Sequence, residues 1–246
     1  LVRTIMNGLA SVKYLGVRNH EFDAVIPYGY KPVYTTEDGL PIYENQYPLP
    51  LGYTYDTITP DSAALKESAV TRQELTLNTA IIDDDVLDDC KNLKQQSSVP
   101  MLSHEIPYEA KYDGVRIQDN MMYFDKEGAT IKLTFESEPN SETYVVYSGD
   151  ITEIDEGNMD YRSVIIKTDE IWYKYAFRTD TYMTGQDQYV FNLGYHKKKG
   201  AVTTCTLKFK LMGSINFDKL SVYSQPMDGY ADSVAARCED VLEHVN

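Results

Sequence analysis

The chain has 246 residues, of which 42% are hydrophobic and 25% are charged, and these values are ordinary for a folded protein with a buried core. The formal net charge of −15 is less ordinary, and it disfavours nucleic-acid binding because neutralising phosphates requires clustered Lys and Arg. Tyrosine is abundant, with 21 Tyr against 7 Phe and 1 Trp, which suits half-buried strands and wet interfaces.

Cysteines and apolar runs limit the class of protein further. Cys90, Cys205 and Cys238 are far apart and odd in number, a pattern that predicts neither a zinc site nor a disulfide framework. We expect no signal peptide within these residues, and no apolar run approaches the roughly 18 residues of a membrane span. Because the chain begins at Leu1 within a segment whose pattern predicts order, we expect it to be a piece of a longer protein.

Residues 1–58 alternate short strand patterns with turns. Asp38-Gly39 forms a tight turn, which predicts a hairpin between the two strands on either side of it. Pro48 and Pro50 exclude a helix from the stretch that follows. The strands that we expect in this region are 11–17, 31–35, 41–44 and 53–56.

Helical patterns follow between residues 59 and 91. Thr59-Pro60-Asp61 predicts a helix start with Thr59 as the N-cap. Thr71-Arg72-Gln73-Glu74 has the form of a capping box and predicts a second start. The polar residues at 92–102 then predict a linker.

From about residue 104, hydrophobic and polar residues alternate along the sequence, a pattern with a period of two. Ile131, Leu133 and Phe135 point to one face, for example, while Lys132 and Thr134 point to the other. Strands with one polar face indicate an antiparallel sandwich rather than a parallel sheet. The expected strands are 129–136, 143–148, 162–167, 171–177, 189–195, 205–211 and 217–223.

An apolar stripe with a period near 3.6 starts at Tyr230 and predicts a terminal helix. The whole pattern predicts an α+β fold with two domains. Residues 1–100 form a small α+β module, and residues 101–246 form a jelly-roll-like antiparallel β-sandwich that ends in the C-terminal helix.

Motifs for catalysis and cofactor binding are absent from the sequence. It contains no G-x-S-x-G, H-E-x-x-H, Walker or dinucleotide-binding pattern, and its four His residues have no metal-ligand spacing. A carbohydrate-active hydrolase would need two opposed carboxylates about 5–9.5 Å apart in a cleft. We therefore expect no catalytic residue, cofactor or metal. Two interpretations of the acidic loop 150–160 stay open, a solvated loop and a calcium site, and we favour the first.

Two further segments are candidates for binding. Residues 196–199, His-Lys-Lys-Lys, are the one basic cluster in the sequence, and they predict either a charged hairpin tip or a contact with phosphate or lipid headgroups. In residues 171–178, Trp172, Lys174 and Arg178 share one face of the expected strand. That face is either part of the core or a wet aromatic surface that holds a sugar.

Three phrases carry a family resemblance: LASVKYLGV at 9–17, PIYENQYPLPLGYTYD at 41–56 and FDKLSVYSQPMDGYADSVAARCEDVLEHV at 217–245. Together they resemble the YfhO family of bacterial polytopic membrane proteins, which are related to type C glycosyltransferases. In that family a VKY strand precedes a YEN…LP segment in the large extracytoplasmic portion. The resemblance covers both ends of the chain and is weakest between residues 100 and 200.

The resemblance implies a function that composition alone does not indicate. The whole protein would transfer a sugar from a polyprenyl-phosphate donor to a cell-envelope polymer, teichoic acid in the best-understood setting. The catalytic acidic residue of type C enzymes lies in an early external loop, which this chain lacks. We therefore expect a non-catalytic domain at the extracytoplasmic face of the cell membrane, with a glycan or polymer and the membrane as partners and no nucleic acid.

The resemblance leaves two functions open for this part of the protein. It recognises or positions glycan, or it braces the membrane part or binds a protein partner without touching sugar. Tyr43 and Asn45 fix a strand–turn–strand junction in one interpretation and contact sugar in the other. The candidate ligand-binding residues are Trp172, Lys174, Tyr195, Tyr43 and Asn45.

Overall fold

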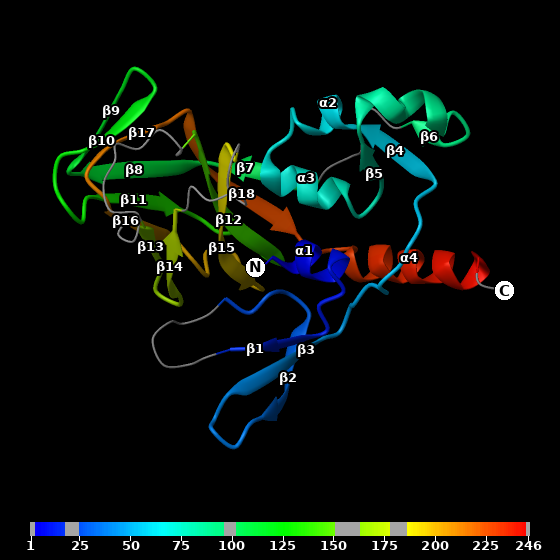
Figure 1. The fold of residues 1–246 in the computed structure, drawn as a ribbon. Helices are drawn as coiled ribbons and strands as arrows, with labels where there is room; N and C mark the ends of the chain where they lie inside the picture. The colour runs from blue at the N-terminus through cyan, green and yellow to red at the C-terminus, as the bar shows by residue number, and fades with distance from the viewer. Residues whose placement is uncertain (1–2, 18–24, 96–101, 151–162, 178–185, 245–246) are drawn as a thin grey trace. The chain divides into compact units, whose positions relative to one another are not determined.

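The computed structural model describes residues 3–17, 25–95, 102–150, 163–177 and 186–244 (Figure 1). The chain divides into two compact units. The first consists of residues 1–18, 26–104 and 225–246, and the second of residues 19–25 and 105–224. The C-terminal helix therefore lies in the first unit. Whether the chain forms two independently folding domains that meet at residue 100 stays a prediction.

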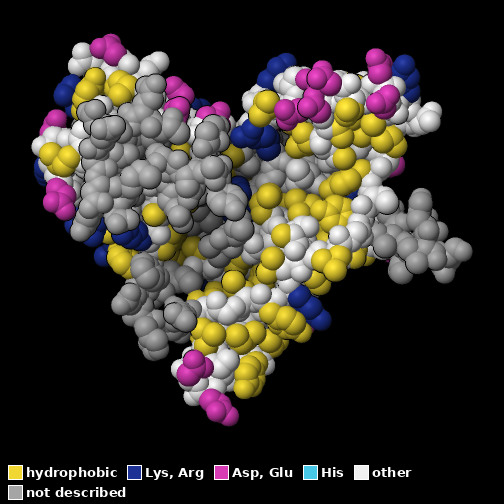
Figure 2. Space-filling view, in the orientation of Figure 1, with side chains coloured by type: hydrophobic (Ala, Val, Ile, Leu, Met, Phe, Trp, Pro, Cys, Tyr) yellow, Lys and Arg dark blue, Asp and Glu magenta, His cyan; other side chains and the backbone are white. Residues whose placement is uncertain are grey.

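The first unit combines short helices with two small sheets. One sheet is antiparallel in the order β1-β3-β2, and the other is parallel in the order β5-β4-β6. The elements are α1 (Thr4–Leu9), β1 (Tyr14–Gly16), β2 (Tyr30–Thr35), β3 (Pro41–Asn45), β4 (Thr57–Pro60), α2 (Asp61–Ala64), α3 (Ala69–Leu75), β5 (Ala80–Ile82), the 3-10 helix η1 (Asp84–Cys90), β6 (Lys94–Gln95) and α4 (Tyr230–His244). The exposed carboxylates of η1 add to the acidic surface (Figure 2).

Helix α3 starts three residues before the expected position. Ser68 is its N-cap, and the Ser68 hydroxyl accepts a hydrogen bond from the N–H of Thr71 at 3.0 Å. Glu74 does not close a capping box. Its carboxylate instead accepts hydrogen bonds from the N–H groups of Leu102 and Ser103, at 2.6 and 2.8 Å.

Arg237 on the C-terminal helix α4 binds this helix to the other elements of the first unit. The Arg237 guanidinium donates hydrogen bonds to the carbonyl oxygens of Thr54, Leu77 and Asn78, at 2.8, 3.2 and 3.3 Å. It also lies 4.6 Å from the centre of the Tyr55 ring. These contacts replace strand pairing at the expected strand 53–56, which the structure does not contain.

The second unit is an antiparallel β-sandwich, as the sequence predicts. A five-stranded sheet has the order β14-β13-β16-β11-β8, a four-stranded sheet has the order β15-β12-β18-β7, and β17-β10-β9 form a third, small sheet. The strands are β7 (His104–Ile106), β8 (Tyr108–Asp113), β9 (Val115–Gln118), β10 (Met121–Phe124), β11 (Thr130–Phe135), β12 (Ser141–Ser148), β13 (Ser163–Lys167), β14 (Trp172–Ala176), β15 (Gln188–His196), β16 (Thr204–Lys210), β17 (Gly213–Asn216) and β18 (Lys219–Pro226).

Aromatic contacts show how the two large sheets pack face to face. Tyr175 on β14 lies 5.4 Å from Phe191 and 6.2 Å from Tyr189, both on β15, measured between ring centres. The Tyr173 hydroxyl donates a hydrogen bond to the carbonyl oxygen of Asn192 at 3.0 Å. Burial of this hydroxyl raises the pKa of Tyr173 well above its usual value. All seven strands expected between residues 129 and 223 are present in these two sheets.

Candidate functional site

The five-stranded sheet of the second unit has one face in the core and one polar face. Alternate residues of β11 and β16 show this division: Leu133 and Leu207 are fully buried, whereas Lys132, Lys208 and Lys210 are exposed. The period of two in the sequence therefore assigns the faces correctly. The polar face is the candidate site.

Strand pairing brings distant lysines together on the polar face. Residues directly opposite each other in neighbouring strands point to the same side of a sheet. One row runs across all five strands through Trp172, Lys167, Thr206, Lys132 and Lys111. Three lysines and the single tryptophan of the chain thus share one line.

A second row lies beside the first. It runs through Lys174, Ile165, Lys208 and Thr130, and Lys210 follows Lys208 by two residues on the same strand. We call the set the lysine face. It consists of Lys111, Lys132, Lys167, Lys174, Lys208 and Lys210.

The lysine face is positively charged within an acidic protein. All six side chains are exposed, and among the described residues no carboxylate lies within 4.0 Å of any of their ammonium groups. Within the described strands of the sheet, acidic residues occur on this side only on β8, as Glu109 and Asp113, and Glu136, just after β11, is paired with Lys199. Asp113 is neutralised by Lys126, whose Nζ lies 2.6 Å from its carboxylate.

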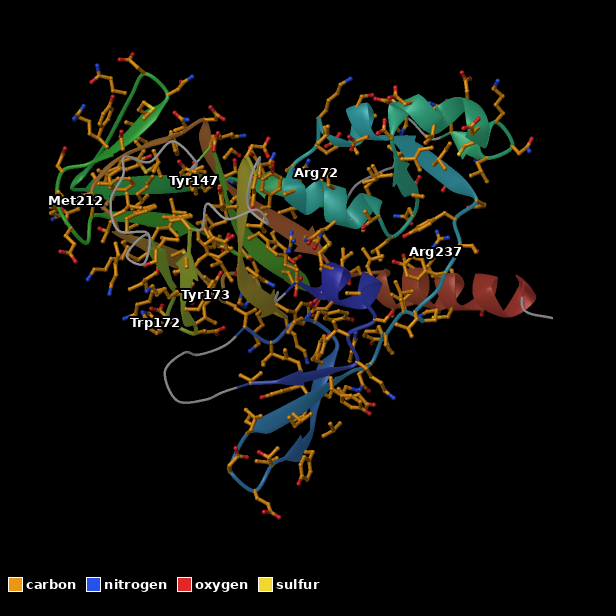
Figure 3. The ribbon with its side chains drawn as sticks, in the orientation of Figure 1. Arg72, Tyr147, Trp172, Tyr173, Met212 and Arg237 are labelled. Atoms are coloured by element: carbon orange, nitrogen blue, oxygen red, sulfur yellow. The ribbon has the colours of Figure 1, made fainter. Side chains whose placement is uncertain are left out.

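Trp172 and Lys174 lie on the polar face, and the intervening Tyr173 points into the core (Figure 3). The alternative in which Trp172 is a core residue is not borne out, because Trp172 pairs with Lys167 on the polar face while Tyr173 and Tyr175 contact the other sheet. Arg178, expected on the same face, lies outside the described residues. A sugar contact at Trp172 and Lys174 stays a prediction.

Tyr195 is in the other large sheet. It lies on β15 opposite Glu142, and its hydroxyl donates a hydrogen bond to Oδ1 of Asn140 at 3.4 Å. The structure therefore does not place Tyr195 on the face that carries Trp172. Its predicted sugar contact would need a separate site.

Asn45 has a structural position at the end of β3. Its side chain is 4% exposed, its Nδ2 donates to the carbonyl oxygen of Val12 at 3.2 Å, and its Oδ1 accepts from the N–H of Tyr47 at 3.0 Å. The local bond to the backbone agrees with the junction interpretation. Tyr43, half-buried, pairs with Leu15 and Pro32 in the β1-β3-β2 sheet of the first unit. A sugar contact at either residue is untested.

Comparison with known proteins identifies the family. The sequence profile described as bacterial membrane protein YfhO matches residues 2–245. The chain belongs to the YfhO family. Within the described ranges, none of the helices combines the length and the hydropathy that crossing a bilayer requires.

Two solved structures are distantly similar to this YfhO-family chain. CBM35 from Paenibacillus barcinonensis has a TM-score of 0.32 and 9% identity, over 49% of this chain and 96% of that one. The C-terminal CBM6 of LamC, a laminarinase from Zobellia galactanivorans, has a TM-score of 0.29 and 6% identity, over 50% and 98%. Scores of this size establish no shared function. No curated protein matches the sequence.

The basic segment 196–199 of the YfhO-family chain is not a hairpin tip. It leaves β15 in one sheet and leads to β16 in the other. His196 is buried, and Lys199 forms an ion pair with Glu136 at 2.9 Å, which raises the pKa of Lys199. Two lysines, Lys197 and Lys198, are left exposed without this pairing. The larger basic cluster is the lysine face, which the sequence does not present as a run.

The burial of His196 predicts a pH dependence of stability. Burial lowers the pKa of His196 below its usual value near 6.5, against a smaller opposing effect of Glu170, whose carboxylate lies 3.8 Å away. The unfolded chain then binds more protons than the folded chain as the pH falls below about 6.5. We expect the free energy of unfolding to have its full value above that pH. At lower pH it should decrease by up to about 1.4 kcal/mol per pH unit.

Urea unfolding between about pH 5 and pH 7 measures this dependence. His196→Gln should flatten the part of the profile that begins near pH 6.5. His104→Gln is the matched control because His104 is exposed. Equal profiles for both variants would contradict the assignment to His196.

Proposed function

We propose that this part of the YfhO-family protein is a non-catalytic extracytoplasmic domain that holds an anionic cell-envelope polymer on its lysine face. Teichoic acid is the polymer that the family resemblance implies. The membrane-embedded part of the protein would glycosylate the polymer while this domain retains it. The observation that carries the proposal is the gathering of six exposed lysines on one sheet face of a chain with a net charge of −15.

The spacing of the lysines favours a ligand with repeated negative charges. Neighbouring strands are about 4.8 Å apart and alternate residues of one strand about 6.7 Å apart, so each lysine has another within about 10 Å. This distance is comparable with the Debye length at physiological salt, about 8 Å, so the potentials of neighbouring lysines overlap. A chain with a phosphate or carboxylate in each repeat would contact several lysines at once.

The remaining side chains of the face favour a hydrated polymer over an apolar ligand. Thr130, Thr134, Thr204 and Thr206 lie between the lysines and offer hydroxyl groups to sugar or phosphate oxygens. Among the described residues, the large hydrophobic side chains with high exposure all lie elsewhere. The face is therefore unsuited to insertion into a bilayer.

Trp172 gives the face a place for a sugar ring. It lies at the β14 edge, directly opposite Lys167, and its half-buried indole presents a flat apolar surface beside a cation. Single sugar contacts are weak, with dissociation constants of about 1 mM. Affinity would come mainly from the lysines, and Trp172 would add preference for a glycosylated repeat.

Titration of the 246-residue chain with poly(glycerol phosphate) tests the proposal, with dextran as the neutral control. We expect amide and indole shifts on β11, β13, β14 and β16 with the anionic polymer and none with dextran. The dissociation constant should rise at least about tenfold between about 50 and 200 mM salt, because bound counterions are released on binding. Equal binding of both polymers, or an affinity independent of salt, would contradict the proposal.

A further inference from the structure

The β1-β3-β2 sheet of the first unit is a second exposed surface, separate from the lysine face. Cross-strand pairing places Tyr14, Glu44 and Lys31 in one row and Gly16, Ile42 and Tyr34 in a second row on the same side. We call this side the tyrosine face, defined by Tyr14, Tyr34 and Ile42 with Lys31 and Glu44. Hydrophobic side chains gather over these strands in Figure 2.

The side chains of the tyrosine face have no covering layer among the described residues. Tyr14 is 54% exposed and Tyr34 is 61% exposed, and β2 is exposed at every position from Lys31 to Thr35. Antiparallel sheets commonly turn an apolar face to the core and a polar face to water. An aromatic face turned to solvent departs from this pattern and is available for a contact with something outside this chain.

The area and the edges of the sheet argue against a second copy of the chain as the occupant. A fully covered aromatic side chain buries about 150–250 Å², so the exposed halves of Tyr14 and Tyr34 offer about 200 Å² together. A stable dimer needs about 800 Å² from each partner. Strand addition at β2 is also blocked, because Pro32 and a bulge between Pro32 and Tyr34 interrupt that edge.

The chemistry of the face fits the water–lipid interface. Tyrosine rings favour this boundary because the ring packs against apolar groups while the hydroxyl stays in water. Lys13 lies 5.3 Å from the centre of the Tyr14 ring, and its long stem can lie along apolar surface with the ammonium in water. Glu44, the one carboxylate of the face, forms an ion pair with Lys13 at 3.8 Å and accepts a hydrogen bond from the Tyr14 hydroxyl at 3.2 Å.

A neighbouring loop adds an aliphatic side chain. Leu51 is 97% exposed, and its loop is joined to the residues before β1 by a hydrogen bond from the Ser11 hydroxyl to the carbonyl oxygen of Pro50 at 2.9 Å. Since the chain belongs to a family of membrane proteins, the bilayer is the apolar surface that the tyrosine face can contact. The geometry points to the tyrosine face as a membrane-contact surface, with Tyr14 and Tyr34 in the headgroup region.

Binding to phosphatidylcholine vesicles tests this inference. These lipids carry no net charge, so lysine–phosphate attraction of the kind proposed for the lysine face contributes little. We expect part of the 246-residue chain to float with the vesicles in a density gradient. Tyr14→Ser combined with Tyr34→Ser should lower the bound fraction at least about fivefold, because most of the exposed aromatic area is lost.

Tyr112→Ser is the matched control, because Tyr112 is also exposed, at 47%, but lies on β8 in the second unit. A spin label on the lipid headgroup should broaden the amide signals of β1 and β2 in the unsubstituted chain, a readout that does not depend on how the variants fold. Absence of vesicle binding, or equal binding by the double variant, would overturn the inference. A self-association that the double variant abolishes would assign the face to a second copy instead.

The outcome is independent of the proposed polymer binding. Lys132→Glu with Lys208→Glu should leave flotation with phosphatidylcholine vesicles unchanged while weakening polymer binding. The tyrosine variant should have the opposite effects. Failure of one proposal is therefore distinguishable from failure of the other.

Discussion

Reversing three charges of the lysine face, as Lys132→Glu, Lys167→Glu and Lys208→Glu in one chain, is expected to weaken binding of poly(glycerol phosphate) at least about a hundredfold. Each lysine near an anionic surface contributes about 1 kcal/mol, and each glutamate adds repulsion. Three positions therefore cost about 3 kcal/mol or more, which corresponds to at least about a hundredfold in the dissociation constant. Isothermal titration calorimetry at low salt measures the change.

The matched control reverses three exposed lysines of the first unit, Lys31, Lys66 and Lys94, to Glu. Both variants lose the same charge, so any difference between them reports position rather than net charge. Substitutions at exposed sites usually change stability by less than about 0.5 kcal/mol, and unfolding curves should confirm this for both variants. Equal loss of polymer binding in both variants would mean that the lysine face is not the site.

Gly149→Ala is expected to destabilise the sandwich by about 4 kcal/mol. Gly149 follows β12 with φ +145°, a conformation that residues with a side chain rarely adopt. A Cβ at this position would lie 2.2 Å from the carbonyl oxygen of Asn216 and 2.8 Å from its carbonyl carbon. Both atoms are backbone, and the hydrogen bond from the N–H of Asp218 to the carbonyl oxygen of Ser148, at 2.9 Å, holds the two segments together.

Backbone strain of about 1–2 kcal/mol and overpacking of up to about 3 kcal/mol combine at Gly149. Gly213→Ala separates the two effects: Gly213 also has a positive φ, +96°, but no atom lies within 4 Å of a Cβ built there. We expect Gly213→Ala to cost only about 1–2 kcal/mol in urea unfolding. Equal losses for the two variants would contradict the role of the Asn216 contact.

The strands of the second unit were predictable because their signal is local. A period of two in the hydrophobic pattern depends only on a strand having one buried face, and β11 and β16 both obey it. The start of α3 was less predictable. Ser68 and Thr71 are both suitable caps, and Glu74 is engaged by Leu102 and Ser103, residues that the sequence separates from it by 28 and 29 positions.

The expected strand at 53–56 was wrong for a similar reason. Alternating tyrosines suit a strand, but the Tyr53 and Tyr55 hydroxyls donate to the carbonyl oxygens of Leu9 and Thr76, and Arg237 takes the carbonyl of Thr54. Arg237, 183 positions further along the chain, thus donates a hydrogen bond to a backbone carbonyl that a neighbouring strand would otherwise pair with. Propensity alone contains no information about such a partner.

Most of the lysine face could not be predicted from the sequence, because its members are spread from residue 111 to residue 210. Only the order β14-β13-β16-β11-β8 brings them together. One signal was available: lysines recur on the polar face of separate strands, as at Lys132, Lys208 and Lys210. The contiguous run at 196–199 was the more visible feature, yet folding buries His196 and pairs Lys199.

The placement of α4 in the first unit has a consequence for biosynthesis. The second unit is almost continuous in sequence, so its strands can pair as soon as residue 224 leaves the ribosome. The first unit needs residues 225–246, because Arg237 donates hydrogen bonds to the carbonyl oxygens of Leu77 and Thr54. These two residues precede Arg237 by 160 and 183 positions. During translation the part of the first unit that precedes residue 105 must therefore remain incompletely bonded until the C-terminal helix has been synthesised.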